Sequence, residues 1–360
     1  MAEVSAQAKA KAATAAAATV TEPAPPGRLG PPGRVRAVAE TRPRKRAAGA
    51  VLVAVTVGAV LAGPWLERLF GIAAIGAWRT LLVAIVVQGV PFLLLGTVVS
   101  AAIGAFVPAR VFSKVLPRNP ALAVPVAGAA GVVLPGCECA SVPVAGSLMR
   151  RGVTPAAALT FLLAAPAVNP VVLVSTAIAF PGSPEMVAAR FGASLVTAVA
   201  MGWLWLRLGR EEWLRLPTGE KDPAPGASRL RVFRRGLQHD FLHAGGFLVV
   251  GAMAAATFNV LVPPSVLEVF SGSPWLGVLV AAVLAVLLSV CSEADAFVAA
   301  SFAGFSPTAR LAFMVVGPMV DMKLIALQSG AFGRAFAVRF CAATFVVAVL
   351  CCVLVGGLFL

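Results

Sequence analysis

The sequence has few charged residues: Asp, Glu, Lys and Arg make up 12% of its 360 residues, whereas an average soluble protein has about 25%. Hydrophobic residues account for 59% of the chain, and the mean hydropathy is +0.93. Such a composition leaves too little polar surface to cover a water-soluble globule. It excludes an ordinary soluble enzyme and predicts an all-α membrane protein, a multi-pass helical bundle.

Acidic residues are scarce as well, with 15 Asp and Glu against 29 Lys and Arg, which gives a net charge of +14. Basic proteins can bind nucleic acid, but nine of the basic residues lie in 1–46 and eight in 207–235, both hydrophilic stretches. Basic residues that flank apolar spans are typical of the cytoplasmic face of a membrane. We therefore expect membrane lipid and no nucleic acid as a partner, with a cytoplasmic N-terminus.

Three familiar patterns are missing. The first 47 residues have no apolar run of the kind found in cleavable signal peptides, so 1–47 is predicted to be a disordered basic cytoplasmic tail, with an organelle transit peptide as the alternative. No Walker motif is present, so we expect no ATP hydrolysis. The six cysteines do not indicate a disulfide framework, because Cys341, Cys351 and Cys352 lie in an apolar terminal span.

Apolar segments follow one another along the rest of the chain. A spanning helix needs about 20 apolar residues, and segment 48–66 predicts an extra N-terminal transmembrane helix. Further spans are expected at 79–107, 154–180, 186–206, 240–262, 307–329 and 335–359. Two shorter segments, 120–135 and 275–290, each run into a polar cluster. Interrupted segments at matching positions of two halves are typical of a transporter binding site.

The two halves of the chain match at an offset of 152 residues. The matching pairs are Gly152 and Gly304, Pro155 and Pro307, Cys139 and Cys291, Pro166 and Pro318, and Asn169 and Asp321. This agreement predicts an internal duplication, with permease-like repeats at 79–206 and 240–359 joined by a basic cytoplasmic linker at 207–239.

The distribution of basic residues predicts how the repeats face. If 120–150 enters from the cytoplasm and returns there, Arg150, Arg151 and the stretch 207–235 are all cytoplasmic, as the positive-inside rule requires. The matching segment 275–304 then enters from the outside. The prediction is an inverted internal repeat with two re-entrant hairpins, whose non-helical backbone must line a cavity or be buried in protein.

The expected hairpin tips carry the residues with chemistry. A carboxylate at membrane depth needs a counter-ion, a proton or water, and thiolates select soft ions whereas carboxylates select hard ones. Three thiols could surround one soft metal ion. The predicted substrate-binding residues of the tips are Cys137, Glu138, Cys139, Cys291, Glu293 and Asp295, with Cys137, Cys139 and Cys291 as candidate metal ligands.

Breaks in two apolar spans predict the other part of the site. Proline removes a backbone hydrogen bond, and the freed carbonyls of a broken helix can coordinate ions. The expected structural breaks are Pro143, Pro166, Pro170 and Pro318, and the adjoining Asn169 and Asp321 are further candidates for substrate binding. Lys323 is expected to neutralise Asp321 or Glu293 when no substrate is bound.

Two kinds of intramembrane enzyme and one non-transporting role remain as alternatives. His239 and His243 flank an Asp in a pattern close to the H-E-x-x-H motif of zinc proteases, although a third ligand is not evident. Cys137 and Cys139 could form a redox pair, although such pairs usually have two residues between the cysteines. A membrane sensor or assembly subunit would bind ligand without moving it.

The block from Gly136 to Pro143, followed by 152–155 and by 161–170, resembles the bacterial predicted permeases of the DUF318 (UPF0718) group, which includes the organoarsenical efflux permeases. The resemblance covers about 79–359. It implies a multi-pass permease of the bacterial cytoplasmic membrane, with Cys137, Cys139, Pro143 and Asn169 matching the pattern of the group. Glu138 departs from it, because relatives often have a small residue between the cysteines.

These observations predict a secondary-type permease, not an enzyme, that moves a soft metal cation, a metalloid or an organoarsenical across the cell membrane, with export as the expected direction. The acids beside the thiols make a metal cation a competitor of the arsenicals that the resemblance implies. No cofactor is expected. A periplasmic or membrane accessory protein is an expected partner.

Overall fold

The structure is a computed structural model that describes residues 73–108, 111, 116–117, 119–133, 137–215, 228–261, 274–302 and 304–360. The predicted tail 1–47 and the predicted helix 48–66 lie outside the described residues. Residues 134–136 and the middle of the predicted linker, 216–227, lie outside them too.

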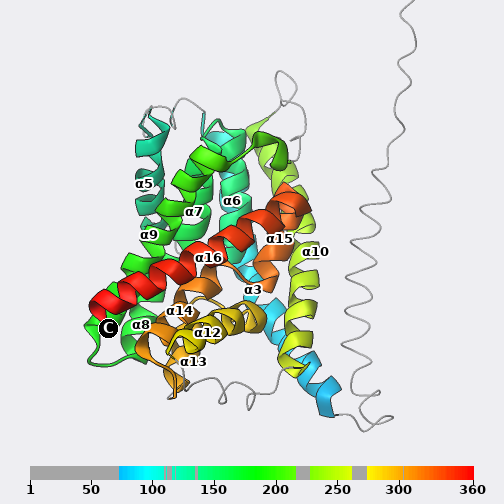
Figure 1. Cartoon of the computed structure of the whole chain (residues 1–360). Coiled ribbons are helices and arrows are strands. Elements are labelled where there is room, and N and C mark those ends of the chain that lie inside the picture. Colours follow the sequence, from blue (N-terminus) through cyan, green and yellow to red (C-terminus); the bar gives the residue numbers. More distant parts are fainter. Residues whose placement is uncertain are drawn as a thin grey trace, which may run out of the picture. The chain divides into compact units, whose positions relative to one another are not determined.

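Every regular element of the described residues is a helix (Figure 1). In chain order they are α3 (Ala73–Phe106), α5 (Pro120–Ala130), η1 (Gly131–Val133), α6 (Glu138–Arg150), α7 (Pro155–Val168), α8 (Pro170–Ala179), α9 (Pro184–Leu208), η2 (Glu211–Trp213), α10 (Arg229–Leu261), α12 (Pro274–Leu288), α13 (Asp295–Ser301), α14 (Pro307–Met319), α15 (Met322–Phe332) and α16 (Arg334–Phe359).

Six of the described segments are long and apolar enough to cross a membrane. They are Ala74–Phe106, Pro155–Ala179, Pro184–Leu208, Arg229–Leu261, Pro307–Phe332 and Arg334–Phe359, and Pro120–Val133 and Trp275–Leu288 are apolar but shorter. The prediction of an all-α multi-pass membrane protein is confirmed. Helix α10 begins at Arg229, so the last residues of the predicted linker form its first turns, where Phe233 packs on Phe106 of α3.

Two of the spans are broken near their middle. Pro166 lies two residues before the end of α7, Asn169 leaves the helical conformation (φ −71°, ψ 156°), and Pro170 starts α8. The residue before a proline is driven toward extended backbone, which explains a break at this position. The second break follows Pro318, and Asp321 is extended there (φ −141°, ψ 170°).

Pro143 was expected to break a helix, and this expectation was wrong. Helix α6 continues through Pro143 from Glu138 to Arg150. Proline has no N–H group, so Pro143 cannot donate the helical hydrogen bond to the carbonyl of Cys139, four residues earlier. The effect is a freed carbonyl near the start of α6 rather than an interrupted helix.

Helices α3 and α10 pack against each other in opposite directions. The indole of Trp78 near the start of α3 donates a 3.0 Å hydrogen bond to Thr257 near the end of α10. At the other end of the pair, the Ser100 hydroxyl donates to Asp240, which also lies 3.5 Å from Arg150 at the end of α6. We call these the Trp78 end and the Arg150 end.

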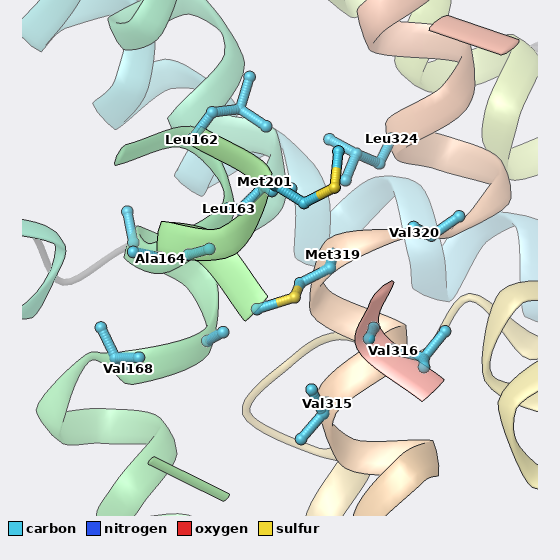
Figure 2. Packing of buried hydrophobic residues seen from close by; sticks show 14 of the residues in the cluster. Leu162, Leu163, Ala164, Val168, Met201, Val315, Val316, Met319, Val320 and Leu324 are labelled. Atoms are coloured by element: carbon cyan, nitrogen blue, oxygen red, sulfur yellow. The ribbon is translucent and has the colours of Figure 1, made fainter. Parts of the chain in front are cut away.

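The short helices occupy different ends of the bundle. Figure 1 shows α5 and α6 beside α7 in the upper half of the view, whereas α12 and α13 lie beside α14 in the lower half. Apolar side chains of α7 and α9 meet those of α14 and the start of α15 in the middle (Figure 2). The labelled residues are Leu162, Leu163, Ala164, Val168, Met201, Val315, Val316, Met319, Val320 and Leu324.

Two glycines allow α3 and α10 to approach the helices that begin in the core. A Cβ atom on Gly96 of α3 would collide with the backbone of Ala140 in α6. A Cβ atom on Gly251 of α10 would lie 2.6 Å from the Cα atom of Lys323 in α15. Small residues at helix contacts let backbones pack closely within a membrane, and here both contacts are with the first turns of α6 and α15.

Replacing Gly251 by alanine should therefore lower the free energy of unfolding by about 1–3 kcal/mol, the usual cost of overpacking. Gly246→Ala is a matched control on the same helix, because no atom lies within 4 Å of the added Cβ position. Unfolding of the purified variants in mixed micelles by increasing denaturing detergent would measure both. Equal stability of the two variants would contradict the close packing at Gly251.

Candidate functional site

A cluster of thiols and a carboxylate lies where the start of α6 meets the segment between α12 and α13. Ligand atoms of Cys137, Glu138 and Cys291 all lie within 4.8 Å of one another, and all three residues are buried. Cys139, the third predicted thiol, is not part of this group; it is also buried and lines the adjoining cavity together with Cys291. Thiolates bound at about 2.3 Å to one ion lie at most about 4.6 Å apart, so little movement would let this group hold a soft ion.

Lys323 supplies the counter-charge of the cluster. Its ammonium nitrogen donates a 2.8 Å hydrogen bond to Glu138 Oε1 and lies 3.4 Å from Asp321 Oδ2. All three side chains are buried, and the two carboxylates compensate one cation. We expected Lys323 to neutralise Asp321 or Glu293; the structure gives it Asp321 and, in place of Glu293, Glu138.

A cavity of about 150 Å³ adjoins the cluster. Its inner wall contains Cys139, Cys291 and Lys323, and its other walls come from the first half of α3, from Asn259 of α10 and from the segment 288–290. Gln88, at the rim, is exposed. The cavity therefore places two thiols and the ammonium group near an exposed residue of α3, in the half of the bundle near the Trp78 end.

The segment that joins α12 to α13 is held by an arginine of α9. Arg190 is fully buried, and its guanidinium bonds Asp295 Oδ2 at 2.7 Å, the Ser292 carbonyl at 3.2 Å and Thr176 Oγ1 at 2.7 Å. Sequence reasoning identified Asp295 and its need for a counter-ion but missed Arg190. A signal was present, because Arg190 is a basic residue within an apolar span, and such residues are usually functional.

The two polar residues at the helix breaks begin the helices that follow them. Asn169 Oδ1 accepts a hydrogen bond from the N–H of Val172, and its amide nitrogen donates to the carbonyl of Ala165. Asp321 Oδ1 accepts from the N–H of Leu324 at 2.5 Å. Asp321 thereby combines capping with its charge near Lys323, while both polar atoms of the Asn169 amide are used within the break.

Glu293 is half-buried in the segment between α12 and α13. Its Oε2 atom is inaccessible and has no hydrogen-bond partner within the described parts of the chain. The same holds for Glu138 Oε2 and Asp295 Oδ1. Each of the three acids predicted at the tips thus keeps one oxygen that could accept a hydrogen bond or bind a cation.

The histidine pair lies apart from the thiol cluster, on the N-terminal half of α10. His239 and His243 are exposed and stacked at 5.9 Å, and His243 Nε2 lies 3.1 Å from the carbonyl of Gly330. Among the described residues, the group able to hold a metal ion is Cys137, Glu138 and Cys291 and contains neither histidine. This geometry gives no support to the zinc-protease alternative.

Comparison with known proteins identifies the family. The profile of the ArsP_1 family, described as "Predicted permease", matches residues 74–357. UPF0718 protein YcgR of Bacillus subtilis (strain 168) is 34% identical over 264 residues, which cover 72% of this chain and 90% of YcgR. A putative two-component membrane permease complex subunit of Streptococcus mutans is 30% identical over 280 residues, which cover 76% of this chain and 93% of that protein.

No solved structure matches the chain. The family match reaches from α3 to α16 and includes the cluster of Cys137, Glu138 and Cys291. The chain is therefore a multi-pass membrane protein that belongs to the ArsP_1 family of predicted permeases.

Proposed function

We propose that the chain is a secondary-type permease that exports a soft metal cation or a trivalent organometalloid across the bacterial cytoplasmic membrane. The observation that carries this proposal is the convergence of Cys137, Glu138 and Cys291 in a buried cluster, next to a cavity that Cys139 and Cys291 line. Soft ligands of this kind select thiophilic ions over hard cations. Membership of a permease family supports transport rather than catalysis.

Lys323 provides a means of handling the charge of a cationic substrate. Its ammonium group forms an ion pair with the Glu138 carboxylate, and the Asp321 carboxylate lies 3.4 Å away as a second partner. When a soft cation binds the thiols and Glu138, the ammonium would move toward Asp321. The buried charge then stays compensated in both states, which matters because an unpaired ion at membrane depth is expensive.

The proposal includes alternating access between two inverted repeats. The breaks at Asn169 and Asp321 occupy equivalent positions at the offset of 152 residues, and Pro155 and Pro307 begin α7 and α14 at the same offset. The Arg150 end would face the cytoplasm, as the positive-inside rule favours. Rocking of one repeat against the other would close the cavity on one side and open the cluster to the other.

A membrane accessory subunit is part of the proposal. The relative from Streptococcus mutans is named as a subunit of a two-component membrane permease complex. By analogy, this chain would form the pathway, and a partner would complete the permease or deliver substrate to it.

Transport by the purified full chain in lipid vesicles tests the proposal. We expect the wild type to move cadmium ion or a trivalent phenylarsenical, and Cys137→Ala to lower the rate about tenfold or more, the scale of losses at metal sites. Cys352→Ala is the matched control, because Cys352 is equally buried but lies in α16.

The rival functions predict different results. His243→Ala should leave transport unchanged. If His243→Ala abolished transport while Cys137→Ala transported at the wild-type rate, the thiol cluster would not be the substrate site. A chain that bound both probes but moved neither across the vesicle membrane, with or without the accessory subunit, would be a sensor. This result would contradict the proposed permease.

A further inference from the structure

Arg190 is a buried charge outside the thiol cluster, and it contacts the segment that follows Cys291. It lies on α9 in the first half of the chain, whereas Ser292 and Asp295 belong to the second half. Thr176 of α8 anchors the other guanidinium nitrogen at 2.7 Å. The guanidinium thus joins the scaffold of one half to the hairpin tip of the other.

The segment that Arg190 holds is the one that fixes Cys291. Ser292 follows Cys291 directly, and the N–H groups of Ala294 and Asp295 donate to the Cys291 carbonyl at 2.9 and 3.0 Å. Arg190 bonds Ser292 and Asp295 at the two ends of this turn. Displacement of either end would move the Cys291 thiol relative to Cys137 and Glu138.

The pair is poorly optimised for stability alone. Arg190 Nε and Asp295 Oδ1 are buried and have no hydrogen-bond partner in the part of the chain that the structure covers. A buried ion pair repays its desolvation only when its remaining polar atoms are satisfied, and apolar side chains of similar size often stabilise equally well. A role in placing the hairpin accounts for the pair better than stability does.

An arginine suits this role because its planar fork can bond several oxygens in fixed directions, whereas a lysine presents one point charge. The first hairpin has a counterpart to this arrangement. Glu138, the first residue of α6, is held by Lys323 of the second half. Each hairpin tip is therefore tied by an ion pair to the opposite half of the chain.

We infer that Arg190 is a positioning residue of the proposed permease, which holds the Cys291 thiol of the second hairpin against Cys137 of the first. The inference rests on the proposed function for its purpose, but its geometry can be tested without transport. The readout is the rate at which a disulfide forms between the two cysteines.

The experiment uses the full chain with Cys139, Cys341, Cys351 and Cys352 replaced by alanine, purified in lipid vesicles and treated with iodine. Iodine takes two electrons from the two thiols, and the products are one disulfide, two iodide ions and two protons. Free thiols are then counted by mass-tagging. We expect rapid closure of the Cys137–Cys291 disulfide, slowed at least tenfold by Arg190→Gln. Arg207→Gln, an exposed position on the same helix, should change nothing.

A second variant keeps the test decisive if Arg190→Gln does not fold. Arg190→Lys keeps the charge near Asp295 but cannot bond Thr176, Ser292 and Asp295 together, so its disulfide should form more slowly than in the parent chain. Closure at the parent rate in either folded variant would overturn the inference. The two proposals can fail separately. If the disulfide formed rapidly in the parent chain and slowly in Arg190→Gln, but the wild type transported neither probe, the positioning role would be supported and the proposed function rejected.

Discussion

Replacing Lys323 by methionine should lower the free energy of unfolding by about 3–5 kcal/mol, the usual cost of leaving a buried charge without its partner. The reason is that one ammonium group compensates two carboxylates, Glu138 at 2.8 Å and Asp321 at 3.4 Å, inside the helical bundle. Both acids would then have to bind a proton or water. Detergent-induced unfolding of the purified variant, followed by circular dichroism, would measure the loss.

A second substitution distinguishes charge from packing. Adding Glu138→Gln to Lys323→Met should recover part of the stability, because one of the two uncompensated carboxylates is removed. The exposed Arg234 on α10 offers a control, and Arg234→Met should change the unfolding free energy by less than about 0.5 kcal/mol. If Lys323→Met unfolds like the wild type, the ion pairs do not hold the site together.

A small charged thiol reagent should modify Cys291 from one face of the membrane only. The cavity that reaches Cys291 lies in the half of the bundle near the Trp78 end, whereas Gly96 and Gly251 close the other half against α6 and α15. A single-cysteine chain that retains Cys291 should react in vesicles that expose the Trp78 end and resist the reagent in vesicles of opposite orientation. The fraction modified, measured by mass spectrometry, gives the result.

A cysteine placed at Arg151 in an otherwise cysteine-free chain reports the opposite face. Position 151 follows α6 directly at the Arg150 end, and we expect it to react from the cytoplasm only. Modification of Cys291 and of position 151 from the same face would contradict the access route. Equal modification of Cys291 from both faces would contradict it too.

The spans could be predicted because an apolar run of sufficient length has few other uses in a protein. All six described spans and both short apolar helices coincide with segments expected from hydropathy. The breaks at Asn169 and Asp321 could be predicted too, because Pro166 and Pro318 precede them and a proline cannot donate a helical hydrogen bond. Pro143 shows the limit of this rule, because α6 tolerates a proline in its interior.

Pairings between distant residues were not readable from the chain. Lys323 and Glu138 are 185 positions apart, and Arg190 and Asp295 are 105 apart. No periodicity connects such residues, so the sequence indicated that the acids need counter-ions without identifying them. Cys139 and Cys291 occupy equivalent positions in the two halves, which suggested that the thiols lie near one another, whereas Arg190 has no acidic or basic match at the same offset.

The crossed ion pairs also constrain how the protein is made. A ribosome delivers Glu138 and Arg190 to the bilayer long before Lys323 and Asp295 have been synthesised. Until the C-terminal half arrives, one acid and one base would sit in hydrocarbon without the residues that neutralise them. The newly inserted N-terminal half should therefore remain loosely assembled, sheltered by the insertion machinery or hydrated, and its final packing should be completed only when translation ends.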